Sequence, residues 1–97
     1  MRRLRFRAEA EADLAEAKSW YEARDPNLGA DLIDAIDAVV RRAAAMPTQF
    51  PVVHRNVRRG LCRRFPYAVY FVTTDDETLV LAVLHQAVDA RRWRGRR

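Results

Sequence analysis

The sequence contains little cysteine and glycine, and each scarcity excludes a class of site. Cys62 is the only cysteine among 97 residues, so the chain has no internal disulfide, which fits a reducing cytoplasm. The three glycines are scattered, so there is no glycine-rich phosphate-binding loop. No paired-histidine or cysteine–histidine spacing occurs either, and we therefore predict neither a metal site nor a cofactor.

Long apolar runs are also absent. The longest, residues 68–72 and 79–84, are far shorter than a membrane span. The opening MRRLRFRAEAEAD is basic but lacks the apolar core of a signal peptide. We therefore expect a cytoplasmic protein that contacts no membrane. The length suits a single domain over residues 1–97, and a hydrophobic share of 49% argues against disorder.

Positive charge is abundant, and almost all of it is arginine. Of the 18 basic residues 17 are arginine, and the formal net charge is +5. Residues 1–46 carry a net charge of −1 and residues 47–97 a net charge of +6. The second half therefore favours an anionic partner, either nucleic acid or an acidic protein segment. An arginine-rich, high-GC genome with a solvated surface is the alternative interpretation, because net charge governs association rather than fold.

The first half predicts a strand followed by two helices. Residues 2–7 alternate arginine with apolar side chains, which is typical of a short strand. Residues 8–24 and then the stripe over 28–43 have apolar side chains at helical spacing. The turn-forming DPNLG at 25–29 separates the two helices, and Pro47 ends the second. Because the break is short, we expect an antiparallel helix hairpin.

The second half changes to a period of two. After a loop over 47–56, strands are predicted over 57–64, 67–73 and 78–86. Their short connections predict an antiparallel meander, and the third strand, apolar on both faces, should be central. The tail VDARRWRGRR has room for one helical turn. The expected fold is α+β: an N-terminal strand, a helix hairpin lying on one sheet face, a three-stranded meander and a short basic C-terminal tail.

Five strings in the chain resemble the ParE/RelE superfamily of toxins from bacterial type II toxin–antitoxin systems. They are AEADLAEAKSWYE, the MP that ends the second helix, the FP of the following loop, RRFPYAVYFV and LHQAVDARRW. The resemblance spans nearly the whole chain. It implies a small cytoplasmic toxin, encoded beside an antitoxin that neutralises it in a toxin–antitoxin hetero-oligomer.

The resemblance leaves two branches to choose between. RelE-like members enter the ribosome and cut mRNA, whereas ParE-like members act on DNA gyrase. RelE-like toxins resemble one another in carrying an arginine where this chain has Tyr67. Arg63, Arg64 and His85 remain as catalytic candidates, but arginine, with a pKa above about 12, does not readily exchange a proton. By strand parity His85 groups with Leu79, Leu81 and Val83 on an apolar face, which favours a structural role.

The resemblance also suggests two sets of binding residues. The set for the target is Arg58, Arg59, Tyr67, Arg91, Arg92 and Trp93. The set for the antitoxin is Trp20, Tyr21, Leu28, Leu32, Arg63 and Arg64. For the arginines the alternative interpretation is protection of an edge strand against aggregation. For the aromatic residues the alternative interpretation is that they belong to the hydrophobic core. Trp93 lies on a basic tail, so it must either fold back on the domain or bind a partner. We expect His54, in a loop without a nearby partner, to be solvated.

The prediction that follows is a ParE-like toxin that poisons gyrase without catalysis of its own. The runner-up is a RelE-like, ribosome-dependent mRNA endoribonuclease. A third hypothesis is an inactive toxin fold that survives as a plasmid-stabilising or regulatory binding protein. The neighbouring reading frame tests the toxin–antitoxin hypothesis most simply. A small protein encoded there with a DNA-binding N-terminus would indicate an antitoxin.

Overall fold

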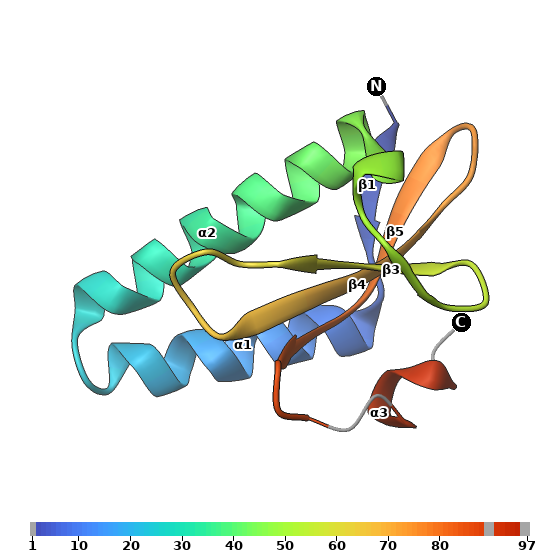
Figure 1. Ribbon diagram of the computed structural model, residues 1–97. Coiled ribbons are helices and arrows are strands. Elements are labelled where there is room, and N and C mark those ends of the chain that lie inside the picture. The colour runs from blue at the N-terminus through green and yellow to red at the C-terminus, as the bar shows by residue number, and fades with distance from the viewer. Residues whose placement is uncertain (1, 89–90, 96–97) are drawn as a thin grey trace.

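The computed structural model describes residues 2–88 and 91–95, without the side chains of residues 91 and 92. Its elements, in chain order, are β1 (Arg3–Phe6), α1 (Ala8–Glu22), α2 (Pro26–Ala45), the 3-10 turn η1 (Pro47–Gln49), β2 (Val52–His54), β3 (Val57–Leu61), β4 (Tyr67–Thr73), β5 (Glu77–His85) and α3 (Arg91–Arg94). Figure 1 shows α1 and α2 as an antiparallel pair joined by a tight turn, which confirms the predicted hairpin. No helix in the described part of the chain is long and apolar enough to cross a membrane.

The turn between the helices is shorter than DPNLG suggested. Asp25 is the N-cap of α2, and its Oδ1 accepts a hydrogen bond from the Asn27 N–H at 2.9 Å. Pro26 occupies the first helical position, where its fixed φ suits the helix and its missing N–H costs nothing. The residues after Asp25 therefore belong to α2, and only Ala23 to Asp25 separate the helices.

The sheet has five strands in the order β1-β5-β4-β3-β2. Strands β3, β4 and β5 form the predicted antiparallel meander, and β5 is central because β1 pairs parallel to its other side. The prediction of a loop over 47–56 was wrong for its second half, since β2 pairs with β3. Arg55, at φ 52°, closes this hairpin. Three residues are too few for periodicity to separate a strand from a loop.

A core lies on each side of the sheet. Between the sheet and the helix pair, the apolar stripe of α2 packs on the inward side chains of β4 and β5, including Val69, Phe71 and Val83. At Gly60, α2 approaches β3 so closely that a Cβ atom would lie 2.7 Å from Val39 Cγ1 and 2.9 Å from Phe50 Cε1. A smaller cluster on the opposite face joins outward side chains of the sheet to the C-terminal α3.

Trp93 provides the contact that joins α3 to this opposite face. Its side chain is 1% exposed and stacks on Tyr70, with ring centroids 4.7 Å apart and planes at 25°. His54 meets the same indole edge-on at 5.8 Å and is half-buried, so the expectation that it lies in a loop without a partner was wrong. Trp93 was expected either to fold back on the domain or to bind a partner, and in the structure it folds back on the sheet.

A bulge in β5 changes the facing of His85. Tyr70 pairs with Ala82 and Phe71 with Val80, so Leu81 is an extra residue and the alternation shifts there. Leu81 consequently joins the cluster under α3, whereas Val83 faces the helices. The prediction that His85 shares a face with Leu79 and Leu81 was therefore wrong, whereas its grouping with Val83 was right. His85 pairs with Tyr67 at the exposed end of β5.

Candidate functional site: an aromatic groove and an arginine groove

The first groove, which we call the aromatic groove, lies between α1 and the adjoining ends of β4 and β5. Its volume is about 500 Å³, and its lining residues are Asp13, Glu16, Ala17, Trp20, Tyr21, Pro66, Tyr67, Val83, Leu84, His85 and Val88. Spacings of four and three residues along α1 place Asp13, Ala17 and Trp20 on one side of the helix. The opposite wall comes from the end of the Tyr67–His85 strand pair.

Four aromatic rings follow one another along the groove. Trp20 and Tyr21 meet edge to face at 4.8 Å, Tyr21 and Tyr67 at 6.2 Å, and Tyr67 and His85 at 5.6 Å. Tyr21 also packs on Phe65 at 5.0 Å, which ties the series to the main core. Edge-to-face pairs at these separations are the favoured geometry of aromatic rings. The groove wall is therefore apolar and held in place from beneath.

Trp20 stands out because most large apolar side chains of the protein are buried. Its side chain is 51% exposed, although the Arg24 guanidinium covers its ring at 3.2 Å from the centroid. Arg24 Nη1 also donates a hydrogen bond to the Trp20 carbonyl at 2.8 Å. The alternative interpretation as a core residue is thus excluded for Trp20, while Tyr21 is partly buried against the core. Tryptophan and arginine are both enriched among the residues that contribute most to binding at protein–protein interfaces.

The aromatic groove carries negative rather than positive charge. Asp13 and Glu16 are its charged residues, and among the described side chains no arginine or lysine lines it. The Asp13 Oδ2 accepts a hydrogen bond from the Val83 N–H at 3.1 Å, which occupies an amide of β5 beyond the end of β1. Burial raises the pKa of the Tyr67 hydroxyl, and Tyr21 and Glu16 add to the rise. Tyr67 is therefore a neutral hydrogen-bond donor at neutral pH.

His85 is held by local contacts at the end of β5. Its Nδ1 accepts a hydrogen bond from the Ala87 N–H at 3.1 Å, and its carbonyl accepts one from the Val88 N–H at 2.9 Å. These bonds, with the Tyr67 contact, fit a residue that shapes the turn after the strand. Within residues 2–88 and 91–95, no group of three or more histidine, cysteine or acidic residues is placed to hold a metal ion.

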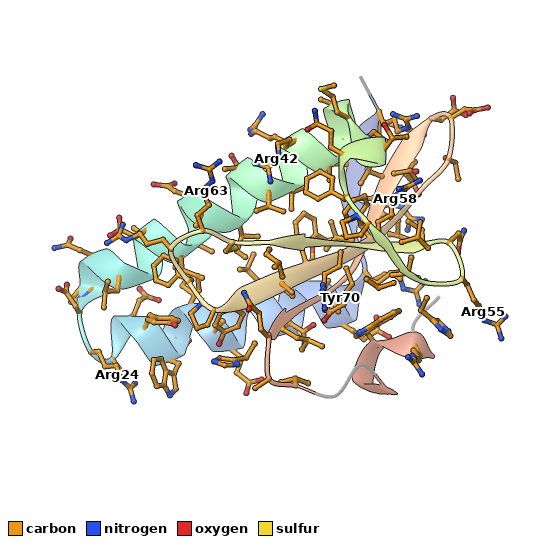
Figure 2. All side chains as sticks on the ribbon, in the orientation of Figure 1. Arg24, Arg42, Arg55, Arg58, Arg63 and Tyr70 are labelled. Atoms are coloured by element: carbon orange, nitrogen blue, oxygen red, sulfur yellow. The ribbon has the colours of Figure 1, made fainter. Side chains whose placement is uncertain are left out.

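The second groove, which we call the arginine groove, lies where α2 and η1 meet β3. Its volume is about 610 Å³, and it is lined by Arg42, Gln49, Phe50, Pro51, Arg59, Leu61 and Arg63. Figure 2 shows Arg42 and Arg63 beside each other along α2, with Arg55 far away at the other end of the β2–β3 hairpin. The Arg42 guanidinium lies over the Phe50 ring at 5.0 Å. Among the residues that the structure describes, no histidine, tyrosine, aspartate or glutamate lines this groove.

The structure divides the residues predicted for the antitoxin. Trp20 and Tyr21 line the aromatic groove and Arg63 the arginine groove. Arg64 forms an ion pair with Asp31 of α2 at 3.0 Å. Leu32 is fully buried in the helix-side core, and Leu28 is half-buried at the start of α2.

The residues predicted for the target are divided as well. Tyr67 lines the aromatic groove and Arg59 the arginine groove, and Trp93 is buried. Arg58 Nη1 donates a hydrogen bond to the Phe50 carbonyl at 2.7 Å. The side chains of Arg91 and Arg92 lie outside the described residues. Both remain predictions for the target.

Sequence reasoning missed Asp13 and Glu16 in one groove and Arg42 and Phe50 in the other. Carboxylates in the middle of the first helix are typical of a solvated face, and an arginine in the last turn of the second satisfies the helix dipole, so neither signals a site. The predicted strand over 57–64 also ends early, at Leu61. Arg63 and Arg64 thus lie in the turn before β4, where strand parity does not apply.

Comparison with known proteins gives concordant matches. Residues 4–90 match the sequence profile of a family described as ParE toxin of type II toxin-antitoxin system, parDE. Curated relatives include Toxin ParE2 from Mycobacterium tuberculosis strains CDC 1551 / Oshkosh and ATCC 25618 / H37Rv. Each is 37% identical over 89 residues, covering 87% of this chain and 81% of the relative. A chain from the structure titled "Chromosomal ParDE TA system from P. aeruginosa" has a TM-score of 0.76 at 21% identity, covering 88% of this chain and 96% of that one. At that identity the structural likeness shows the fold alone.

Proposed function

Since the chain belongs to the ParE family and is the toxin component of a type II toxin–antitoxin system, we propose that it poisons DNA gyrase by binding and that a cognate antitoxin neutralises it. The proposal that the toxin has no catalytic activity of its own rests on one observation: the arginines and the groups that could transfer protons line different grooves. Tyr67 and His85 line the aromatic groove, whereas Arg42, Arg59 and Arg63 line the other.

RNA cleavage by the 2′-hydroxyl requires both kinds of group at one phosphate. A base and an acid must exchange protons with the reacting oxygens, and cations must stabilise the negative charge of the transition state. In the aromatic groove, Asp13 and Glu16 would repel the phosphate instead. The arginine groove offers cations, but its described lining includes no histidine or carboxylate to exchange the protons. Neither described lining combines both kinds of group, which supports binding over efficient mRNA cleavage in this proposal.

The aromatic groove suits the antitoxin. A segment that buries the exposed Trp20 ring and covers Tyr21 and Tyr67 would remove apolar surface from water. Tryptophan and tyrosine are the residue types that carry most binding energy at protein interfaces. An apolar helix or extended segment fits such a groove. Binding to the folded toxin would also stabilise this small domain by mass action.

The target surface is proposed on the strongly basic part of the chain. Arg58 and Arg59 lie on β3. The tail that carries Arg91 and Arg92 is held against the sheet by Trp93. Arginine recognises carboxylates and phosphates with a fixed fork of donors, so such a surface would suit gyrase or its bound DNA. Trp93 would then act by positioning the tail rather than by direct contact.

Two assays with the purified toxin test the proposal. In the first, the toxin is incubated with gyrase, ATP and supercoiled plasmid, and gyrase-linked DNA breaks are expected. In the second, it is incubated with translating ribosomes and mRNA, and intact transcripts are expected. Cut transcripts without DNA breaks would refute the gyrase proposal and favour the RelE-like alternative. Growth that is unaffected by expression without the antitoxin would indicate an inactive toxin fold.

A further inference from the structure

The arginine groove contains an open sheet edge. In β3, Cys62 N–H bonds to the Tyr67 carbonyl, so by the alternation of antiparallel pairs the N–H and C=O of Leu61 point away from β4. On that outer side Arg59 N–H bonds to the Pro51 carbonyl, after which the chain of η1 diverges towards α2. Strand β2 pairs only with the beginning of β3. No described residue pairs with Leu61 there, and its side chain is 46% exposed.

The arginines around this edge have no acidic partners. The ion pairs of the neighbouring arginines are Arg41 with Asp37 and Arg64 with Asp31. No ion pair in the described part of the chain involves Arg42, Arg59 or Arg63. The Arg59 Nε is buried without a hydrogen-bond partner among the described residues. The groove therefore concentrates positive charge that the toxin itself does not neutralise.

The occupant that satisfies both features is an extended peptide with carboxylate side chains. Its backbone would pair with Leu61 as an added strand, and its carboxylates would bond to Arg42 and Arg63. A second copy of this chain is disfavoured, because edge-to-edge pairing would bring two arginine sets together. Nucleic acid would use the arginines but would leave the strand edge and the exposed Leu61 unsatisfied.

From these contacts we infer that the arginine groove is a second antitoxin site, which takes an extended acidic segment of the antitoxin as an additional strand along β3. The inference rests on the proposed neutralisation by an antitoxin. It divides the antitoxin between two grooves of different chemistry. Apolar burial in the aromatic groove provides most of the affinity, and charge pairing at the β3 edge provides register and a fast association rate.

The test uses the toxin and the antitoxin encoded with it. The variant R42Q/R63Q removes two positive charges from the groove. Its matched control, R41Q/R55Q, removes two positive charges elsewhere: Arg41 points to Asp37 and Arg55 lies in the distant hairpin turn (Figure 2). For each, the Kd for the antitoxin is measured from 50 to about 300 mM salt, a range over which exposed charges become screened. Hydrogen exchange at the Leu61 amide is followed in the free and bound wild-type toxin, and thermal melts check folding.

We expect R42Q/R63Q to weaken antitoxin binding about tenfold more than the control, with a smaller salt dependence. The Leu61 amide should exchange slowly only in the complex. Equal affinities of the two variants, or an unprotected Leu61 amide, would overturn the inference while leaving the antitoxin proposal intact. If the wild-type toxin does not bind the antitoxin at all, the proposed neutralisation fails and the inference with it. The binding of both variants to a short double-stranded DNA is measured as well. If R42Q/R63Q loses DNA binding but keeps the antitoxin affinity of the control, the groove is a phosphate site and the inference is refuted.

Discussion

Replacing Trp93 with alanine tests whether the C-terminal tail is part of the folded domain. The indole is 1% exposed, stacks on Tyr70 and covers a cluster that includes Leu81 and Leu84. Burying a tryptophan removes about 200 Å² from water, which contributes about 5 kcal/mol as an upper value. Replacing it with alanine would release α3, and the entropy regained by the freed tail would offset part of this loss. The indole Nε1 has no hydrogen-bond partner among the described residues, so its removal relieves a further cost.

We therefore expect Trp93→Ala to lower the free energy of unfolding by about 2 kcal/mol, which lowers the Tm of a domain this size by about 8–16 °C. Trp93→Phe should lose less, because phenylalanine keeps the stacking on Tyr70 without a buried N–H. The matched control is Trp20→Ala, since Trp20 is 51% exposed. It should change stability by less than about 1 kcal/mol and weaken antitoxin binding at least about tenfold.

Thermal and urea unfolding, followed by circular dichroism, measure the difference. Hydrogen exchange in β4 and β5 then shows whether the uncovered sheet face opens. If Trp93→Ala melts within about 3 °C of the wild type, the tail contributes little and its docking on the sheet is not what orders it. If Trp20→Ala is the more destabilising of the two, the assignment of Trp20 as an exposed binding residue is refuted.

Three further substitutions or conditions test particular contacts. Gly60→Ala should cost about 1–3 kcal/mol in a chemical unfolding curve, because its Cβ would collide with α2, whereas Gly95→Ala has nothing within 4 Å and should be neutral; equal stability of the two would refute the close approach. Asp13→Ala leaves the buried Val83 N–H without its acceptor and should cost about 1–3 kcal/mol, while Asp13→Asn keeps an oxygen there and should cost less. Burial raises the pKa of the Cys62 thiol to about 11, so the stability it contributes is complete below about pH 9 and is lost as the pH rises towards 11. At pH 8 iodoacetamide should alkylate the folded protein about 100-fold more slowly than the denatured one, and equal rates would contradict that burial.

Long periodic segments were predictable from the sequence. The stripe along α2 and the alternation of β4 each involve many residues in sequential contact, so one misplaced residue does not hide the period. Short or irregular features were not. The three residues of β2 gave no pattern, and the single extra residue at Leu81 reversed the facing of part of β5. A bulge depends on how two strands align, which neither strand specifies alone.

The side chains that surround a given residue were harder to predict than the helix or strand to which that residue belongs. The sequence identified His85, Tyr67 and the arginines of β3 as chemically capable groups. Whether they act together depends on distances across the fold, and the structure places the two kinds of group in different grooves. Trp93 raised a similar question, since a tryptophan in a basic tail is compatible with either docking or partner binding until its burial is known.

By itself, the sequence determined the order of the elements apart from η1 and β2, the helix hairpin, the antiparallel meander and the resemblance to the ParE/RelE toxins. These follow from local periodicity, turn chemistry and short strings, all of which act between residues close along the chain. Only the tertiary structure decided that Trp20 is exposed while Trp93 is buried, that Arg42 joins Arg63 around an open strand edge, and that none of the described arginines lines the groove of Tyr67 and His85. Those facts depend on packing between residues far apart in sequence, and packing is fixed only when the helices and the tail have docked on the sheet.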